Sequence, residues 1–164
     1  MLSVHIHSEE RMATHSWFLG IVTYLDGNIG EAGVLLIYRD IDGNGDRWTI
    51  PGEKTMNFPS DIPSWLKGEL EAQLSDLGIL VSEKQIDSFT PIIPPTSEPD
   101  HDQHLYDAIW ESGTIMSAPW RPGNPGPSTG DVGYFKQGEL LGMDANEFGA
   151  NHYAILMKYF GLYT

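Results

Sequence analysis

The residues with the clearest capacity for chemistry are two carboxylates, Glu69 and Asp76, in a segment whose leucines recur at helical spacing. At roughly 100° per residue, both carboxylates fall on one flank of the leucine face. Mg²⁺ prefers oxygen ligands, and two carboxylates separated by whole helical turns hold one such ion loosely. The flank leaves three interpretations open: a solvated helix face in an acidic protein, a weak single-metal site, or a competent catalytic site. The leucines are Leu66, Leu70, Leu74 and Leu77, and the same flank carries Ala72 and Gln73.

A second acidic segment, residues 40–46, has the sequence DIDGNGD. Its polar residues match positions 1, 3, 5 and 6 of an EF-hand calcium loop, but position 12 would be a proline and no flanking helices are expected. A tight hairpin turn explains the same composition, because Asp, Asn and Gly tolerate positive φ. We expect a turn, with adventitious Ca²⁺ binding as the alternative. The matching residues are Asp40, Asp42, Asn44 and Gly45.

Trp120 and Arg121 are candidates for contact with a small molecule. Both lie in a segment rich in proline and glycine, residues 119–130, which is too interrupted to form regular structure. An indole ring in a loop can stack on a nucleobase, and a neighbouring guanidinium can pair with a phosphate. Packing of the aromatic ring in the core is the competing explanation.

Composition and charge exclude several classes of function. The chain has 164 residues and no cysteine, so it has neither a disulfide framework nor a thiolate metal site. Nine basic residues against 23 acidic ones give a net charge of −14, which argues against binding to a nucleic-acid backbone or an anionic membrane. No apolar run approaches the roughly 20 residues that span a bilayer, and no signal peptide is visible, so a cytoplasmic location is expected.

The distribution of apolar residues and chain breakers predicts an α+β or mixed α/β domain over residues 16–164, preceded by a polar arm over residues 1–15. A helix is expected from an N-cap at Ser64 to Gly78. A second helix is expected over residues 151–160. The expected strands are residues 17–25, 33–38, 47–50, 85–93, 104–111 and 132–135, and the expected loops are residues 53–63, 94–103 and 119–130.

The order of these elements resembles the Nudix superfamily. Trp48, Pro51 and Gly52 match the start of its signature, and Leu77, Gly78 and Ile79 match its end. The closing elements match at Phe135, Glu139 and Leu140, and then at His152, Ala154, Ile155 and Leu156. The resemblance implies an α/β/α sandwich with a mixed β-sheet. It also implies metal-assisted hydrolysis, with Mg²⁺ or Mn²⁺, of a nucleoside diphosphate linked to another moiety.

The signature departs from the family in its acidic residues. Glu53 replaces the second glycine, and Pro59 falls where a glutamate belongs in a loop that is longer than usual. Counting back from Gly78, the position of the pattern's arginine is occupied here by a glutamate. Of the three positions at which the pattern has glutamate, only one carries an acidic residue in this chain. The position of the arginine is Glu71, and those of the glutamates are Ala72, Ser75 and Asp76.

The resemblance assigns roles to seven residues. It implies that Glu69 and Asp76 are the catalytic metal ligands, aided by Glu53 and the Gly52 carbonyl. Trp120, Arg121 and His104 would then contact a nucleotide-like small molecule. The alternative is a catalytically impaired module that binds such a ligand, or a protein partner, without hydrolysis. A homodimer is one assembly that the sequence leaves open.

Overall fold

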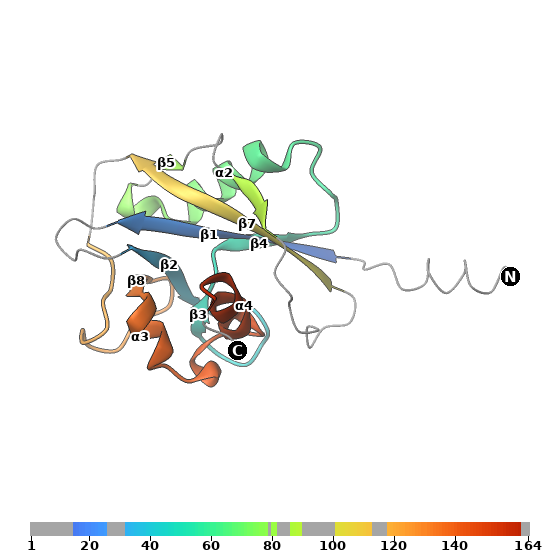
Figure 1. Cartoon of the computed structure of the whole chain (residues 1–164). Helices are drawn as coiled ribbons and strands as arrows, with labels where there is room; N and C mark the ends of the chain where they lie inside the picture. The colour runs from blue at the N-terminus through green and yellow to red at the C-terminus, as the bar shows by residue number, and fades with distance from the viewer. Residues whose placement is uncertain are drawn as a thin grey trace, which may run out of the picture.

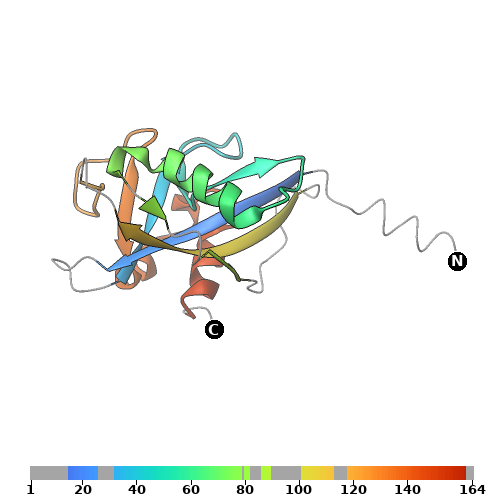
Figure 2. The same cartoon turned by 90° about the horizontal axis from the view of Figure 1, so that it is seen from above.

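A twisted β-sheet lies between helices on both of its faces in the computed structural model (Figures 1 and 2). The structure describes residues 15–25, 32–78, 80–81, 86–89, 101–112 and 118–161. Helix α2 (Ile62–Gln73) covers one face, and helix α4 (His152–Tyr159) covers the other together with the short helix α3 (Gln137–Leu141). The predicted α/β/α sandwich is therefore confirmed. No helix among the described residues is long and apolar enough to cross a membrane.

Strand β1 (His15–Leu25) is the centre of the sheet. It pairs with β2 (Ala32–Arg39) and β4 (Gly52–Thr55) in antiparallel fashion and with β7 (His101–Ser112) in parallel, so the sheet is mixed as predicted. Strand β2 in turn pairs with two strands, and β7 with two others, all antiparallel. The partners of β2 are β3 (Arg47–Thr49) and β8 (Val132–Lys136), and those of β7 are β5 (Leu80–Val81) and β6 (Asp87–Phe89).

The leucine face of the predicted helix forms the core on one side of the sheet. All four leucines are at most 2% exposed, and they pack with Phe18 and Val22 of β1. A separate cluster on the opposite face joins α4 to the other side chains of β1, including Leu19 and Ile21. This alternation along one strand is the period of two that places successive side chains on opposite faces. The buried leucines are Leu66, Leu70, Leu74 and Leu77.

The start of α2 differs from the prediction. Ser64 is not the N-cap, because the helix begins at Ile62 and Asp61 caps it by accepting a hydrogen bond from the Ser64 backbone N–H at 3.2 Å. Pro63 fits the first turn, where a missing N–H costs nothing. The end of the helical segment is as expected: a 3₁₀ turn, η1 (Ser75–Leu77), closes on Gly78 in the left-handed conformation at φ 68°.

Several predicted boundaries need correction. The expected loop over residues 53–63 begins with strand β4, whose polar, charged sequence lacks the apolar alternation that marks a strand. β7 begins at His101, so the loop expected over residues 94–103 ends earlier than predicted. β1 begins at His15, so the polar arm expected over residues 1–15 is also shorter. Helix α3 and the 3₁₀ turn η3 (Ala145–Glu147) were not predicted. Residues 1–14, 82–85 and 90–100, which carry the rest of these expectations, lie outside the described residues.

Gly52 lies at the closest approach of β4 to β1. Its φ is 148°, and a Cβ at this position would lie 2.1 Å from the Phe18 carbonyl oxygen and 2.8 Å from Leu19 Cα. Both obstacles are backbone atoms, so neither can move without displacing the central strand. The pairing of β4 with β1 therefore requires glycine here.

We predict that Gly52→Ala destabilises the protein by more than about 3 kcal/mol, because the added methyl group collides with the backbone of β1. Gly68→Ala is the matched control: Gly68 lies inside α2 with open space around it, and the substitution should stabilise the helix by about 0.5–1 kcal/mol. Urea-induced unfolding followed by circular dichroism measures the free energy of unfolding of both variants and of wild type. Equal stability of the two variants would contradict the close approach.

Candidate functional site

The Arg39 guanidinium lies in a cage of oxygen atoms where β3, β4 and α2 meet. Its Nε donates to Thr49 Oγ1 at 2.8 Å, and its Nη2 donates to the carbonyl oxygens of Ile50 at 3.1 Å and Gly52 at 3.3 Å. Its Nη1 lies 3.5 Å from Gln73 Oε1 on the helix. Four oxygen atoms from four residues therefore surround one cation.

Gln73 joins the same junction from the helix side. Its Nε2 donates to the Gly52 carbonyl at 2.8 Å, and its Oε1 accepts from the Gly52 N–H at 2.9 Å. Both backbone polar groups of Gly52 are thus satisfied by one carboxamide. The Gly52 carbonyl, which the resemblance assigned to a metal, accepts from both Gln73 and Arg39.

Burial changes the electrostatics of this junction. It lowers the pKa of Arg39 from its usual value, and the negative charge of Glu53 opposes that shift. A guanidinium titrates so far above neutrality that Arg39 still carries its charge under all physiological conditions. The junction therefore holds a permanent positive charge next to the Gly52 carbonyl.

The predicted metal ligands do not form a cluster of three at this junction, although the charge of Glu53 acts on Arg39. Glu53 is exposed on β4, and Asp76 lies in η1 beyond the end of the helix. Among the described residues, no group of three or more histidine, aspartate or glutamate side chains is placed to hold a metal ion. As they stand, the oxygen atoms at Gly52 face a guanidinium and an amide, so they do not fit a divalent cation. The roles of Glu53, Glu69 and Asp76 as metal ligands stay predictions.

The opposite flank of α2 is fixed to β5. Lys67 Nζ lies 2.6 Å from Glu71 Oε2, and the same carboxylate oxygen accepts the Val81 N–H at 2.8 Å. Lys67 also donates to the Val81 carbonyl at 2.9 Å. Helix α2 is therefore held on both flanks, by Gln73 on one side and by this ion pair on the other.

Trp120 extends the sheet along β8 although it lies in the proline- and glycine-rich segment. Its N–H donates to the Val132 carbonyl at 2.8 Å, and its own carbonyl accepts from the Tyr134 N–H at 2.9 Å. Its ring packs on Trp48 at 5.0 Å between centroids, and its indole N–H donates to the Pro125 carbonyl at 2.9 Å. The prediction of an irregular segment is thus only partly right, because Trp120 is held in place by the strand.

Trp120 lines two cavities. The larger, of about 380 Å³, is called here the Asp76 cavity and also has Asp131 and Asn124 in its wall. The smaller, of about 290 Å³, contains Arg47 and lies beside Trp48. The structure therefore brings together one predicted metal ligand, Asp76, and one predicted ligand-contacting residue, Trp120.

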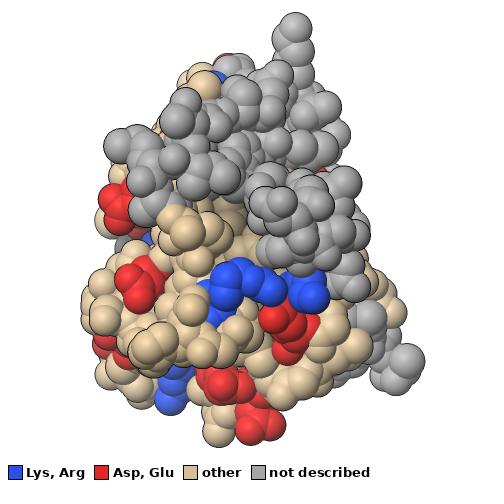
Figure 3. All heavy atoms as spheres, turned by 90° about the vertical axis from the view of Figure 1, so that its left-hand side faces the viewer, with Lys and Arg blue, Asp and Glu red and all other residues tan. Residues whose placement is uncertain are grey.

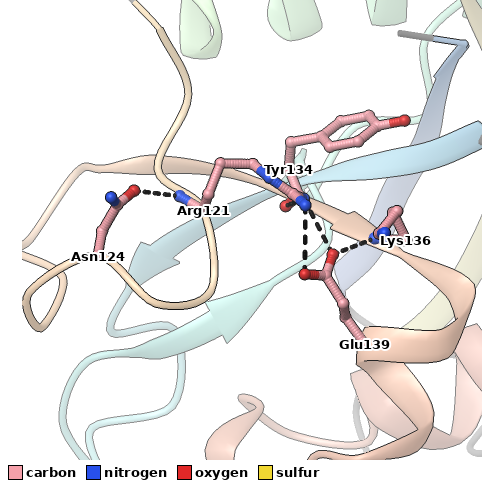
Figure 4. A network of polar contacts seen from close by, with 5 residues as sticks. All are labelled: Arg121, Asn124, Tyr134, Lys136 and Glu139. Carbon is pink, nitrogen blue, oxygen red and sulfur yellow. Dashed lines mark hydrogen bonds and ion pairs between the residues drawn. The ribbon is translucent and has the colours of Figure 1, made fainter. Parts of the chain in front are cut away.

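Arg121 is committed to protein contacts (Figure 4). Its Nη1 donates to Glu139 Oε1 at 2.9 Å and to the Tyr134 carbonyl at 2.7 Å, while Nη2 donates to Glu139 Oε2 at 3.2 Å. Glu139 Oε1 also accepts from the Lys136 N–H at 2.9 Å, at the start of α3. In this arrangement the guanidinium fixes the cavity wall to β8 and α3. Basic side chains on the face drawn in Figure 3 likewise lie beside acidic ones.

His104 lies on the other face of the sheet from Trp120. Its ring stacks on Phe18 at 4.9 Å with an interplanar angle of 14°, and Phe58 meets it edge-on at 5.5 Å. Phe18 belongs to the α2 cluster, whereas Trp120 packs against the α4 cluster. The three predicted ligand-contacting residues therefore do not form one site.

The acidic segment 40–46 forms a turn between the hydrogen-bonded strands β2 and β3, as expected. The Asp40 carboxylate accepts backbone N–H groups of Asp42, Gly43 and Gly45, and Asp42 accepts that of Asn44. Burial alone would raise the pKa of Asp42, but hydrogen bonds from the backbone N–H groups of Asn44 and Ala150 hold it below its usual value. The carboxylates thus stabilise the turn itself.

His152 is a buried functional candidate whose environment the sequence did not reveal. Its side chain is 1% exposed, and its Nδ1 accepts the Ile50 N–H at 2.9 Å. Burial, reinforced by the positive charge of Arg39, lowers its pKa to about 3. The imidazole is therefore neutral, and it supports Ile50 from the α4 side while Arg39 binds the Ile50 carbonyl. Its position at the start of a helix does not indicate this partner, which lies 102 residues away in the sequence.

Comparison with solved structures finds proteins that share this architecture. A mutT/nudix family protein from Listeria innocua is 17% identical, with 90% of this chain and 91% of that chain covered and a TM-score of 0.56. A protein from Jonesia denitrificans, described as a possible asymmetric diadenosine tetraphosphate hydrolase, is 13% identical, with 89% and 92% covered and a TM-score of 0.57. The chain has the Nudix fold.

A third structure extends the similarity to the full chain. The Nudix domain of Shewanella oneidensis NrtR, solved in complex with ADP ribose, is 13% identical, with 100% of this chain and 99% of that chain covered and a TM-score of 0.55. No protein-family model and no curated protein matches the sequence. The similarity to these Nudix proteins is therefore a similarity of fold.

We predict that His152 makes stability depend on pH. Because its pKa is about 3 in the folded protein and 6.5 when unperturbed, the unfolded chain binds the proton more readily. The contribution is complete above about pH 6.5 and falls by about 1.4 kcal/mol per pH unit as the pH drops towards 3. His152→Asn keeps an acceptor that does not titrate, so urea unfolding at pH 7 and pH 5 should give a smaller loss for this variant than for wild type. Equal losses would contradict a neutral buried histidine.

Proposed function

We propose that this protein binds a nucleotide-like small molecule in the Asp76 cavity and does not hydrolyse it by a metal-assisted route. One observation carries the proposal: Asp76 and Trp120, assigned to the site separately, line the same cavity. Its volume of about 380 Å³ lies in the range of small-molecule sites. A structural neighbour in complex with ADP ribose supports the class of ligand.

The chemistry of the cavity favours the nucleoside part of such a ligand. The Trp120 ring offers an aromatic surface to a base. The carboxylates of Asp76 and Asp131 accept hydrogen bonds from amino or hydroxyl groups, such as those of a base edge or a ribose. No lysine, arginine or histidine is among the described residues of the wall, so a phosphate there would meet only negative charge. The phosphates would then extend towards solvent.

The contacts at Gly52 support binding without hydrolysis. Cleavage of a diphosphate develops negative charge on phosphoryl oxygens, which divalent ions neutralise in metal-assisted hydrolases. Here Gln73 and Arg39 engage the Gly52 carbonyl. Each loss of about 1.4 kcal/mol of charge stabilisation lowers the rate tenfold, so the loss of even one ion slows the reaction by orders of magnitude.

A hydrolase with a divergent metal site is the second candidate. It would use Mg²⁺ or Mn²⁺ held by Glu69 and Asp76, with Glu53 as a third ligand. The position of Asp76 at the cavity favours this reading, as does the neighbour described as a diadenosine tetraphosphate hydrolase. In that case the Asp76 cavity would hold the substrate, and both carboxylates would be required for turnover.

We predict that adenosine and AMP bind in the presence of EDTA, with adenosine at least as tightly as AMP because the cavity is acidic. Trp120→Leu should weaken binding about tenfold or more, since base stacking contributes about 1–3 kcal/mol. Phe58→Leu is the matched control, because Phe58 is 63% exposed and lies on the other face, beside His104. Isothermal titration calorimetry measures the affinity of wild type and of both variants for each ligand. Absence of binding, or equal weakening by both substitutions, would contradict the proposal.

Incubation with ADP-ribose and dinucleoside polyphosphates in Mg²⁺ or Mn²⁺ separates the two candidates. We expect no release of AMP or phosphate, as followed by chromatography. Turnover that is abolished by both Glu69→Gln and Asp76→Asn would instead establish the hydrolase.

A further inference from the structure

The oxygen cage around Arg39 has the composition of a cation site. Thr49 supplies a hydroxyl, Ile50 and Gly52 supply carbonyls, and Gln73 supplies an amide oxygen. These neutral oxygen ligands, together with carboxylates, are the groups that bind hard divalent ions in proteins. Here a guanidinium lies among them, with its donors directed at all four.

We infer that Arg39 is a built-in cation that takes the place of a divalent ion, so that this chain closes the junction of β4 and α2 without metal. Gln73 completes the closure, because its carboxamide donates to the Gly52 carbonyl and accepts the Gly52 N–H. The inference does not depend on whether a nucleotide binds the Asp76 cavity.

The covalent attachment of the cation explains why a free ion would not displace it. Arg39 is part of β2, so its effective concentration at the cage is far above that of any dissolved ion. The guanidinium also carries a single charge, which suits a cage of four neutral oxygens better than a dication without a carboxylate in its ligand set. The nearby Glu53 supplies a compensating negative charge from outside the cage.

The same geometry predicts how a metal site could be created. Arg39→Met would remove the cation and one donor to the Gly52 carbonyl. Gln73→Glu would then place a carboxylate where the amide now meets Gly52, one helical turn after Glu69. The double variant would therefore present a carbonyl and two carboxylates on one side of the junction.

Paramagnetic broadening by Mn²⁺ in ¹⁵N-correlated NMR spectra tests the inference. In wild type we expect no selective broadening of the Gly52 and Gln73 signals, and the thermal midpoint should be the same in EDTA and in Mg²⁺. In Arg39→Met/Gln73→Glu we expect selective broadening at Gly52 at a Mn²⁺ concentration at least tenfold lower than any effect in wild type. The double variant should also gain a metal-dependent rise in midpoint.

Arg39→Met/Gln137→Glu is the matched control. It has the same net charge, but its new carboxylate is exposed at the start of α3. It should show no selective effect at Gly52. Selective broadening of wild type at Gly52 would overturn the inference, and this result is decisive even if a variant does not fold. A folded double variant that shows no gain over this control would overturn it too, because the cage would then not be a cation position.

Discussion

The hydrogen bonding of one half-buried guanidinium, that of Arg39, connects three strands and a helix at the junction of β4 and α2. Arg39 extends from β2 to a hydroxyl of β3, to two carbonyls around the start of β4 and to an amide on α2. A buried charge without such partners is strongly unfavourable, so these segments must keep their relative positions for the cation to stay satisfied. The interaction is therefore a constraint on geometry as well as a source of stability.

The short segment 48–52 transmits this constraint to both faces of the sheet. Ile50 contacts Arg39 through its carbonyl and His152 through its N–H, so α4 is connected to α2 through Ile50 and Arg39. The carbonyls on either side are also used, since Trp48 accepts the Gly149 N–H and Pro51 accepts the Gly20 N–H, both at 2.9 Å. This stretch of backbone thus makes direct hydrogen bonds to β1, β2, α2 and α4.

Local periodicity in the sequence was sufficient to predict many of the helices, strands and turns. The leucine face of α2, the turn at residues 40–46 and the buried strand β2 each have a pattern contained within a few neighbouring residues. Strand β4 was missed because its sequence is polar throughout, and α3 because five residues are too short to show a helical period. The α/β/α sandwich was then predicted from the order of the elements along the whole chain, which resembles that of the Nudix superfamily.

The candidate site was harder to predict because its contacts join residues distant in sequence. The interaction of Arg39 with Gln73 spans 34 positions, and that of Ile50 with His152 spans 102. Gln73 was recognised only as a member of the acidic flank, since no local pattern shows what a polar side chain will face. Likewise, the parallel pairing of β1 with β7 sets the face on which His104 lies, and that register is not encoded near His104.

Glu139 takes part in two interactions, the ion pair with Arg121 and the cap of α3, and this restricts how the protein can diversify. The same carboxylate binds the guanidinium of Arg121, the residue that follows Trp120 of the cavity wall, and accepts the N–H that opens α3. A lineage that remodels the loop to admit a different molecule must either retain this acidic residue or find a new cap for α3 in the same step. The arginine–glutamate pair at positions 121 and 139 should accordingly stay unchanged among descendants, and ligand preference should evolve by exchange at residues 124–131.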